Sequence, residues 1–153
     1  LLEVGAGNGA LAKLLKEDGV KVTSLDIGDQ SLYGEVRVYN GAEFPFGDKH
    51  FDVCQLITML HHTTNAEQLI QEAKRVSNRI IIMEDVYESQ FQKYITWFAD
   101  SLVNWEFYGH PHTNRTDSEW KVLFEKNGLT LESVEYYRFL FFFKQVTYVL
   151  KAD

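Results

Sequence analysis

The stretch LLEVGAGNGA, residues 1–10, decides the fold of this chain. It sets three glycines, Gly5, Gly7 and Gly9, between a short apolar segment and a run of residues with helical spacing. Glycines at such a junction permit a tight turn, let a ligand approach the backbone closely, and leave the amides at the start of the helix available to an anionic group. The stretch therefore predicts a strand, a turn and a helix that bind a nucleotide-like ligand.

A dinucleotide and a different nucleotide-like cofactor would both fit this turn. Gly5, Gly7 and Ala10 satisfy the dinucleotide pattern G-x-G-x-x-G/A, so the glycines alone do not choose between cofactors. Glu3 is more informative, because a carboxylate within a strand of Leu and Val is costly to bury unless it binds something, and a dinucleotide fold does not need it there. Asp26 ends the next predicted strand, where a carboxylate can accept both hydroxyls of a ribose; a solvated turn aspartate is the alternative.

Apolar strands alternate with helices along the rest of the chain. This alternation implies βαβ crossovers and a parallel sheet, to which the two closing strands are most simply added antiparallel. We therefore predict an α/β fold: a doubly wound, Rossmann-like, mostly parallel seven-stranded sheet with an antiparallel C-terminal strand, in a three-layer α/β/α arrangement. Strands are expected at 1–4, 20–26, 35–40, 51–60, 79–86, 129–139 and 145–152. Helices are expected at 9–19, 66–76 and 116–128, and a further long helix has an apolar face from Phe91 to Trp105. The last helix opens with a capping box, Thr116 and Glu119.

Length and composition limit the classes of protein. A chain of 153 residues with 45% hydrophobic content predicts a single domain over residues 1–153, and its start within a strand, without Met, suggests that N-terminal helices precede it. The net charge of -7 argues against nucleic acid or an anionic membrane as partner. Because the single cysteine, Cys54, lies in an apolar run and no run is long enough to span a bilayer, we expect a buried thiol in a cytoplasmic protein.

These motifs together resemble a class I S-adenosylmethionine (SAM)-dependent methyltransferase, of the small-molecule branch similar to the type 11 methyltransferase domains. LLEVGAGNG matches the first motif of that family, with its Glu-x-Gly-x-Gly-x-Gly core, and SLD, which ends at Asp26, matches its ribose-binding acid. Residues 40–62, NGAEFPFGDKHFDVCQLITMLHH, resemble the family's stretch from the third strand through Pro-Phe and Phe-Asp to Leu-His-His. The order of elements matches over essentially the whole chain.

The resemblance implies a set of cofactor contacts. The glycine turn would pass close to the methionine part of SAM, and the end of the fourth strand would line the same part. Glu3 would orient the glycine turn or reach the amino group of SAM through water. Asp26 would hold the ribose, and Ile27 would pack on the adenine. The implied cofactor-binding residues are Glu3, Gly5, Ala6, Gly7, Gly9, Asp26, Ile27, Asn40, Gly41, Leu56 and Ile57.

The chain departs from the family at three places. Asn40 stands where the family usually has Asp; its carbonyl can still bond the adenine amino group, without charge. Asp26 and Val36 are too close in sequence for a full crossover helix between them, so we expect a short or irregular connection. The usual Lys-Pro-Gly-Gly turn before the fifth strand is replaced by KRVSNR.

Methyl transfer from SAM mainly requires alignment of a nucleophile with the S–CH3 bond and exclusion of water, so a dedicated base is optional. His61 and His62 are the candidates for a catalytic base; packing or capping within a loop is the alternative. Glu84 and Asp85 lie at the carboxyl end of the fifth strand and either bind a cationic or hydroxylated substrate or form an exposed turn or N-cap.

Further residues are expected near the substrate or at an interface. Trp105, His110 and His112 are predicted to lie near the substrate; the two histidines lack a third ligand, so no metal is predicted. The apolar run from Phe139 to Phe143 is either covered by upstream residues or forms a homodimer contact. The leading hypothesis is methylation of a small molecule; a catalytically silent binding module and an NAD-dependent oxidoreductase remain as alternatives.

Overall fold

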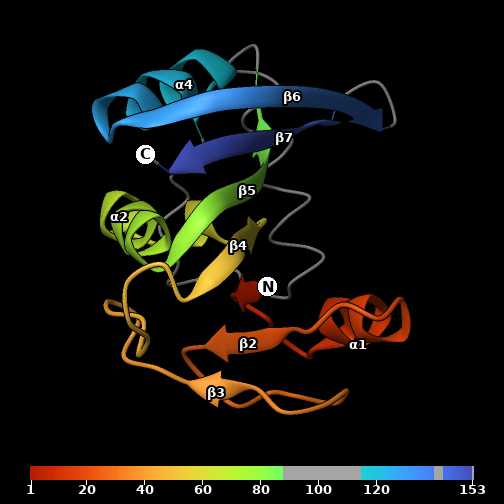
Figure 1. Cartoon of the computed structure of the whole chain (residues 1–153). Coiled ribbons are helices and arrows are strands. Elements are labelled where there is room, and N and C mark those ends of the chain that lie inside the picture. The colour runs from red at the N-terminus through yellow and green to blue at the C-terminus, as the bar shows by residue number, and fades with distance from the viewer. Residues whose placement is uncertain (88–114, 140–142, 153) are drawn as a thin grey trace.

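The computed structural model describes residues 1–87, 115–139 and 143–152, with the side chains of Phe139 and Phe143 excluded. Seven strands form one sheet in the order β3-β2-β1-β4-β5-β7-β6 (Figure 1). All neighbours from β3 to β5 are parallel, and β7 runs antiparallel to both β5 and β6. The strands are β1 Leu2–Val4, β2 Thr23–Asp26, β3 Arg37–Val38, β4 Phe51–Ile57, β5 Ser77–Val86, β6 Leu129–Phe139 and β7 Phe143–Ala152. The predicted sheet is therefore confirmed.

Helices cover both faces of the sheet. Helix α1 (Ala10–Glu17) lies on one face, and α2 (Ala66–Val76) and α4 (Asp117–Lys126) lie on the other (Figure 1). The predicted bounds of α2 and the capping box of α4 are confirmed: Thr116 Oγ1 accepts from Glu119 N, and Glu119 Oε2 accepts from Thr116 N at 2.7 Å. The predicted helix from Phe91 to Trp105 lies outside the described residues.

The hydrophobic core lies between the sheet and the α2–α4 layer. Alternate residues of the central strands point into it and are almost fully buried, as are the apolar faces of the two helices. Trp120 and Phe124 of α4 stack at 5.8 Å, and the ring of Tyr148 on β7 meets Phe124 edge-on at 5.0 Å between centroids. Cys54 is buried in this core, as predicted, and burial raises the pKa of its thiol.

Several strand boundaries differ from the prediction, and β2 begins at Thr23 rather than at residue 20. β4 ends at Ile57 rather than at residue 60, because Thr58 has a positive φ of 48° that leaves the extended region, and a short 3-10 helix, η1 (Leu60–His62), follows. β3 has only two residues. Residues 27–36 contain no helix, which confirms the expected irregular connection between β2 and β3.

The topology creates an opening at one edge of the sheet. The chain runs outward from β1 through β2 to β3 and then returns to β4 on the other side of β1. The connections that follow β1 and β4 therefore diverge at the carboxyl ends of these two strands, which is where open α/β sheets bind ligands.

Candidate cofactor site

The glycine turn after β1 is fastened to β2 and packed against the loop after β4. Gly5 N and Ala6 N both donate to the carbonyl of Leu25, at 2.9 and 3.1 Å. Gly5 has a φ of 76°, and a Cβ added to it would lie 3.0 Å from both Cβ and Cγ of Met59. Glycine is therefore favoured here for two reasons: an L side chain is disfavoured at that φ, and Met59 fills the space that a Cβ would need.

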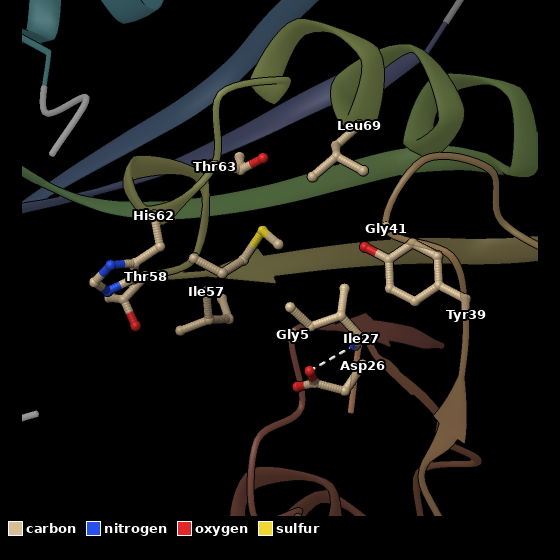
Figure 2. A pocket seen from close by; sticks show the side chains of 11 residues that line it. Gly5, Asp26, Ile27, Tyr39, Gly41, Ile57, Thr58, His62, Thr63 and Leu69 are labelled. Carbon is tan, nitrogen blue, oxygen red and sulfur yellow. Dashed lines mark hydrogen bonds between the residues drawn. The ribbon is translucent and has the colours of Figure 1, made fainter. Parts of the chain in front are cut away.

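Asp26 closes the turn from the end of β2. Its Oδ2 accepts from Gly7 N at 2.7 Å, and its Oδ1 accepts from Ile27 N at 2.6 Å and Gly28 N at 3.4 Å (the Asp26–Ile27 bond is dashed in Figure 2). A carboxylate has about four acceptor positions and three of those of Asp26 are occupied, so about one remains for a hydrogen bond from a ligand. Asp26 therefore orders the glycine turn and also presents an anionic acceptor to the space beside it.

Glu3 lies on β1 beneath the turn, between β2 and β4. It is only 4% exposed and stands in register with Ser24 of β2 and Gln55 of β4. Ser24 Oγ donates to Glu3 Oε2 at 3.0 Å. Burial raises the pKa of Glu3, while hydrogen bonding from Ser24 and Gln55 opposes that rise. The buried carboxylate thus finds partners within the sheet, below the turn that it was predicted to orient.

A cavity of about 350 Å³ opens beside Asp26 and Gly5 (Figure 2). This volume lies within the range of about 300–1,000 Å³ typical of small-molecule sites. One end is formed by Asp26, Ile27, Tyr39 and Gly41, and the other by the loop after β4, with His62 beside Thr58. The complete lining is Gly5, Asp26, Ile27, Tyr39, Gly41, Ile57, Thr58, Met59, His62, Thr63 and Leu69.

Five of the predicted cofactor residues line this cavity: Gly5, Asp26, Ile27, Gly41 and Ile57. The other predicted contacts, Glu3, Ala6, Gly7, Gly9, Asn40 and Leu56, do not line it. Their contacts with SAM remain predictions.

Asn40 and Leu56 have other places in the structure. Asn40 Oδ1 accepts from the amides of Ala42 and Glu43, at 3.0 and 2.9 Å, and so closes the turn that contains Gly41. Leu56 is fully buried in the core. The carbonyl that was expected to bond adenine therefore has two backbone partners in this structure.

Tyr39 is the main lining residue that the sequence prediction missed. It follows the two-residue strand β3, and its hydroxyl points toward the centre of the cavity (Figure 2). Burial and the nearby Asp26 carboxylate raise its pKa to about 12, so the phenol stays protonated and can donate a hydrogen bond at neutral pH. Its place directly before Asn40, at the edge of the sheet, was the signal available in the sequence.

The two histidines of η1 have different positions. His61 is 3% exposed, and its Nδ1 lies 2.6 Å from Glu84 Oε2. His62 lines the cavity, and its ring lies 4.0 Å from that of His61 between centroids. Of the two catalytic candidates, only His62 faces the space where a ligand would bind.

The predicted substrate residues near the end of β5, Glu84 and Asp85, do not act as a pair. Glu84 is fully buried and bonded to the loop after β4, so it is neither an exposed turn residue nor part of the cavity lining. Asp85 points to the opposite face of the sheet, where Gln145 Nε2 lies 3.4 Å from its Oδ1. Trp105, His110, His112 and the side chains of Phe139 and Phe143 lie outside the described residues.

The comparisons with known proteins identify the family of this chain. A family model described as "Methyltransferase domain" matches residues 2–79, just over half of the 153 residues. The chain belongs to this methyltransferase domain family. The matched region holds the glycine turn, Asp26 and both histidines of η1, so the resemblance to class I SAM-dependent methyltransferases is confirmed.

Individual relatives extend the comparison. A demethylmenaquinone methyltransferase from Tropheryma whipplei is 29% identical over 105 residues, which cover 60% of this chain and 44% of that protein. The match thus spans less than half the length of this relative. A SAM-dependent methyltransferase from Methanosarcina mazei shares the fold, with a TM-score of 0.78 and 16% identity over 98% of this chain and 90% of that one.

A magnesium protoporphyrin IX methyltransferase from Synechocystis, solved with S-adenosylhomocysteine bound, has a TM-score of 0.70 and 16% identity over 98% of this chain and 73% of that one. The methyltransferase fold is therefore shared at low identity. Within the described residues, the structure contains no helix whose length and hydrophobicity would suit a bilayer span.

Proposed function

We propose that this protein is a SAM-dependent methyltransferase that transfers the methyl group to a small molecule by in-line displacement. The observation that carries the proposal is the cavity between the glycine turn and the loop after β4, with the Asp26 carboxylate at its edge. The family membership and the SAM- or S-adenosylhomocysteine-related structural neighbours support the same cofactor.

The residues of the cavity fit an adenosyl compound. Asp26 has acceptor capacity for a ribose hydroxyl, Ile27 and Tyr39 supply apolar and aromatic surface for a base, and Gly5 lines the cavity without a side chain. The side chain of Ile27 is 70% exposed, as expected for a surface that a ligand covers. The bound cofactor would supply an electrophilic methyl group, already activated by its sulfonium.

The protein's own contribution is to orient the acceptor and exclude water. We place the acceptor end beside Thr58 and His62, because these residues line the end of the cavity away from Ile27 and Tyr39 (Figure 2). His62 can accept a proton from an acceptor hydroxyl at this end, whereas His61 is engaged with Glu84. The buried Cys54 thiol supports our proposal of a reducing, cytoplasmic location.

Replacement of Asp26 tests the proposal. Asp26→Asn removes the charge and one of the two acceptor oxygens, so affinity for S-adenosylhomocysteine should fall by about 1.5–3 kcal/mol, the range for hydrogen bonds to a charged group. Isothermal titration calorimetry measures this loss. Asp29→Asn makes the same chemical change three residues further on, at an exposed carboxylate that binds only Ser31, and should leave the affinity unchanged.

A parallel titration with NAD separates the alternatives. Binding of S-adenosylhomocysteine with no binding of NAD supports the proposal. Preference for NAD would identify an oxidoreductase site, and binding of neither compound would identify a catalytically silent module. Equal affinity of wild type and Asp26→Asn for S-adenosylhomocysteine would remove Asp26 from the site.

A further inference from the structure

Glu84 is a fully buried carboxylate that holds the loop after β4. Its Oε1 accepts from Met59 N at 3.1 Å and from Leu60 N at 2.7 Å. These amides lie at the start of η1, where the first amides of a helix have no acceptor within the helix itself. Glu84 therefore supplies, from the neighbouring strand β5, the acceptors that this turn lacks.

The loop that Glu84 holds is strained at the cavity wall. Thr58 is β-branched and adopts a φ of 48°, a conformation that such residues rarely occupy. Its amide donates to the carbonyl of Met83 at 2.7 Å, directly before the two amides that Glu84 accepts. Strained residues persist where the surrounding structure over-determines them. Here β5 provides that constraint through Met83 and Glu84.

The second oxygen of Glu84 connects to the cavity through two rings. Glu84 Oε2 lies 2.6 Å from Nδ1 of His61, and both side chains are buried. Because an ionised carboxylate only accepts hydrogen bonds, the hydrogen of this contact belongs on Nδ1. The His61 ring in turn packs against the ring of His62, which lines the cavity.

We infer that Glu84 is a positioning residue for the acceptor end of the cavity. It fixes the strained turn at residues 58–60 through the backbone, and it fixes the orientation and tautomer of His61, against which His62 is packed. The inference deepens the proposed function, because it assigns the acceptor wall of the same cavity. The geometry of Glu84 and His61 can nevertheless be tested without any methyl acceptor.

Glu84→Gln separates the two actions of the carboxylate. The Gln side chain keeps a carbonyl that can accept from Met59 N and Leu60 N, but it presents an NH2 group to His61. His61 Nδ1 must then accept, so the ring hydrogen moves to Nε2. Two-bond ¹H–¹⁵N spectra of the histidine rings at pH 8, assigned with His61→Gln, report this change directly. Glu132→Gln is the matched control, because Glu132 pairs with Arg79 on the exposed side of β6.

The expected result is an Nδ1-protonated His61 in the wild type and in Glu132→Gln, and an Nε2-protonated His61 in Glu84→Gln. Because both loop amides keep an acceptor, Glu84→Gln should bind S-adenosylhomocysteine within about threefold of the wild type. Glu84→Leu removes both acceptors and should weaken that binding by about tenfold or more. A side chain that only filled space would change neither the tautomer nor the order of these affinities.

Three results would overturn the inference: an Nε2-protonated His61 in the wild type, an unchanged tautomer in Glu84→Gln, or a folded Glu84→Leu with wild-type affinity. If Glu84→Leu does not fold, the tautomer in Glu84→Gln decides alone. A wild type that fails to bind S-adenosylhomocysteine would refute the proposed function, whereas the ring spectra would still judge the role of Glu84.

Discussion

The glycine turn offers a comparison of two substitutions that differ chiefly in the steric contact that an added Cβ would make. Gly5 and Gly7 both have a positive φ, 76° and 53°, so alanine at either position is strained by the backbone. A Cβ on Gly7 meets nothing within 4 Å, whereas a Cβ on Gly5 lies 3.0 Å from both Cβ and Cγ of Met59. The pair therefore separates the cost of backbone strain from the cost of a steric overlap.

The magnitudes follow from these two terms. Left-handed backbone costs alanine about 1–2 kcal/mol, offset by about 0.4–1 kcal/mol because alanine restricts the unfolded chain more than glycine. Gly7→Ala should therefore lower the free energy of unfolding by about 0.5–1 kcal/mol. Gly5→Ala adds an overpacking cost of about 1–3 kcal/mol, because Met59 Cβ is fixed to a backbone that Glu84 holds in place and cannot easily move away.

Urea denaturation followed by circular dichroism measures both variants. In thermal melts, the Tm of Gly5→Ala should be lower than that of Gly7→Ala by about 2–4 °C for each kcal/mol of difference in the free energy of unfolding. Calorimetric titration with S-adenosylhomocysteine should also show the larger loss for Gly5→Ala, since Gly5 lines the cavity and Gly7 does not. If Gly7→Ala were as destabilising as Gly5→Ala, the assigned contact between the glycine turn and Met59 would be wrong.

Three other substitutions or treatments test separate parts of the structure. Thr58→Gly should raise the free energy of unfolding by up to about 1 kcal/mol, because relief of the strained φ outweighs the added entropy of the unfolded chain, and a clear loss in urea denaturation would contradict the strain. The Cys54 thiol should react with Ellman's reagent only after unfolding, since it is fully buried with a raised pKa; fast reaction of the folded protein would contradict its place in the core. The pKa of Tyr39 is about 12 when folded and near 10 when unfolded, so its contribution to stability is complete below pH 10 and is lost as the pH rises to about 12. Tyr39→Phe should therefore lose less stability across that interval, as thermal melts at several pH values would show.

Local signals carried most of the fold prediction. The capping box at Thr116, the glycine at the end of α4 and the length of α2 are encoded by neighbouring residues, and the structure confirms each of them. The apolar run of residues 51–60 misled the prediction at its end, because hydrophobicity does not report that Thr58 turns to a positive φ. Helical spacing likewise could not indicate that α1 buries Ala12 while Leu14 stays 59% exposed.

The site was predictable where a motif ends a strand and unpredictable where partners meet across the fold. Asp26 and Gly5 come together because β1 and β2 are adjacent, which the strand–turn–helix pattern implies. Glu84 was correctly placed at the carboxyl edge of the sheet, but its partner His61 lies 23 positions away on a different connection. No local sequence pattern indicates that the Glu84 carboxylate binds the start of the 3-10 helix η1 rather than a substrate.

Three carboxylates fasten connections between the elements of the sheet by accepting hydrogen bonds from backbone amides. Asp26 accepts from the glycine turn, Glu84 from the start of η1, and Glu72 of α2 from Phe44 N at 2.7 Å. The pKa of Glu72 is lowered, chiefly by its hydrogen bonds with Arg75, so this carboxylate keeps its charge as an acceptor well into the acidic range. Each loop is thus held by a side chain from a neighbouring element. The sheet and α2 in this way hold the loops that shape the cavity.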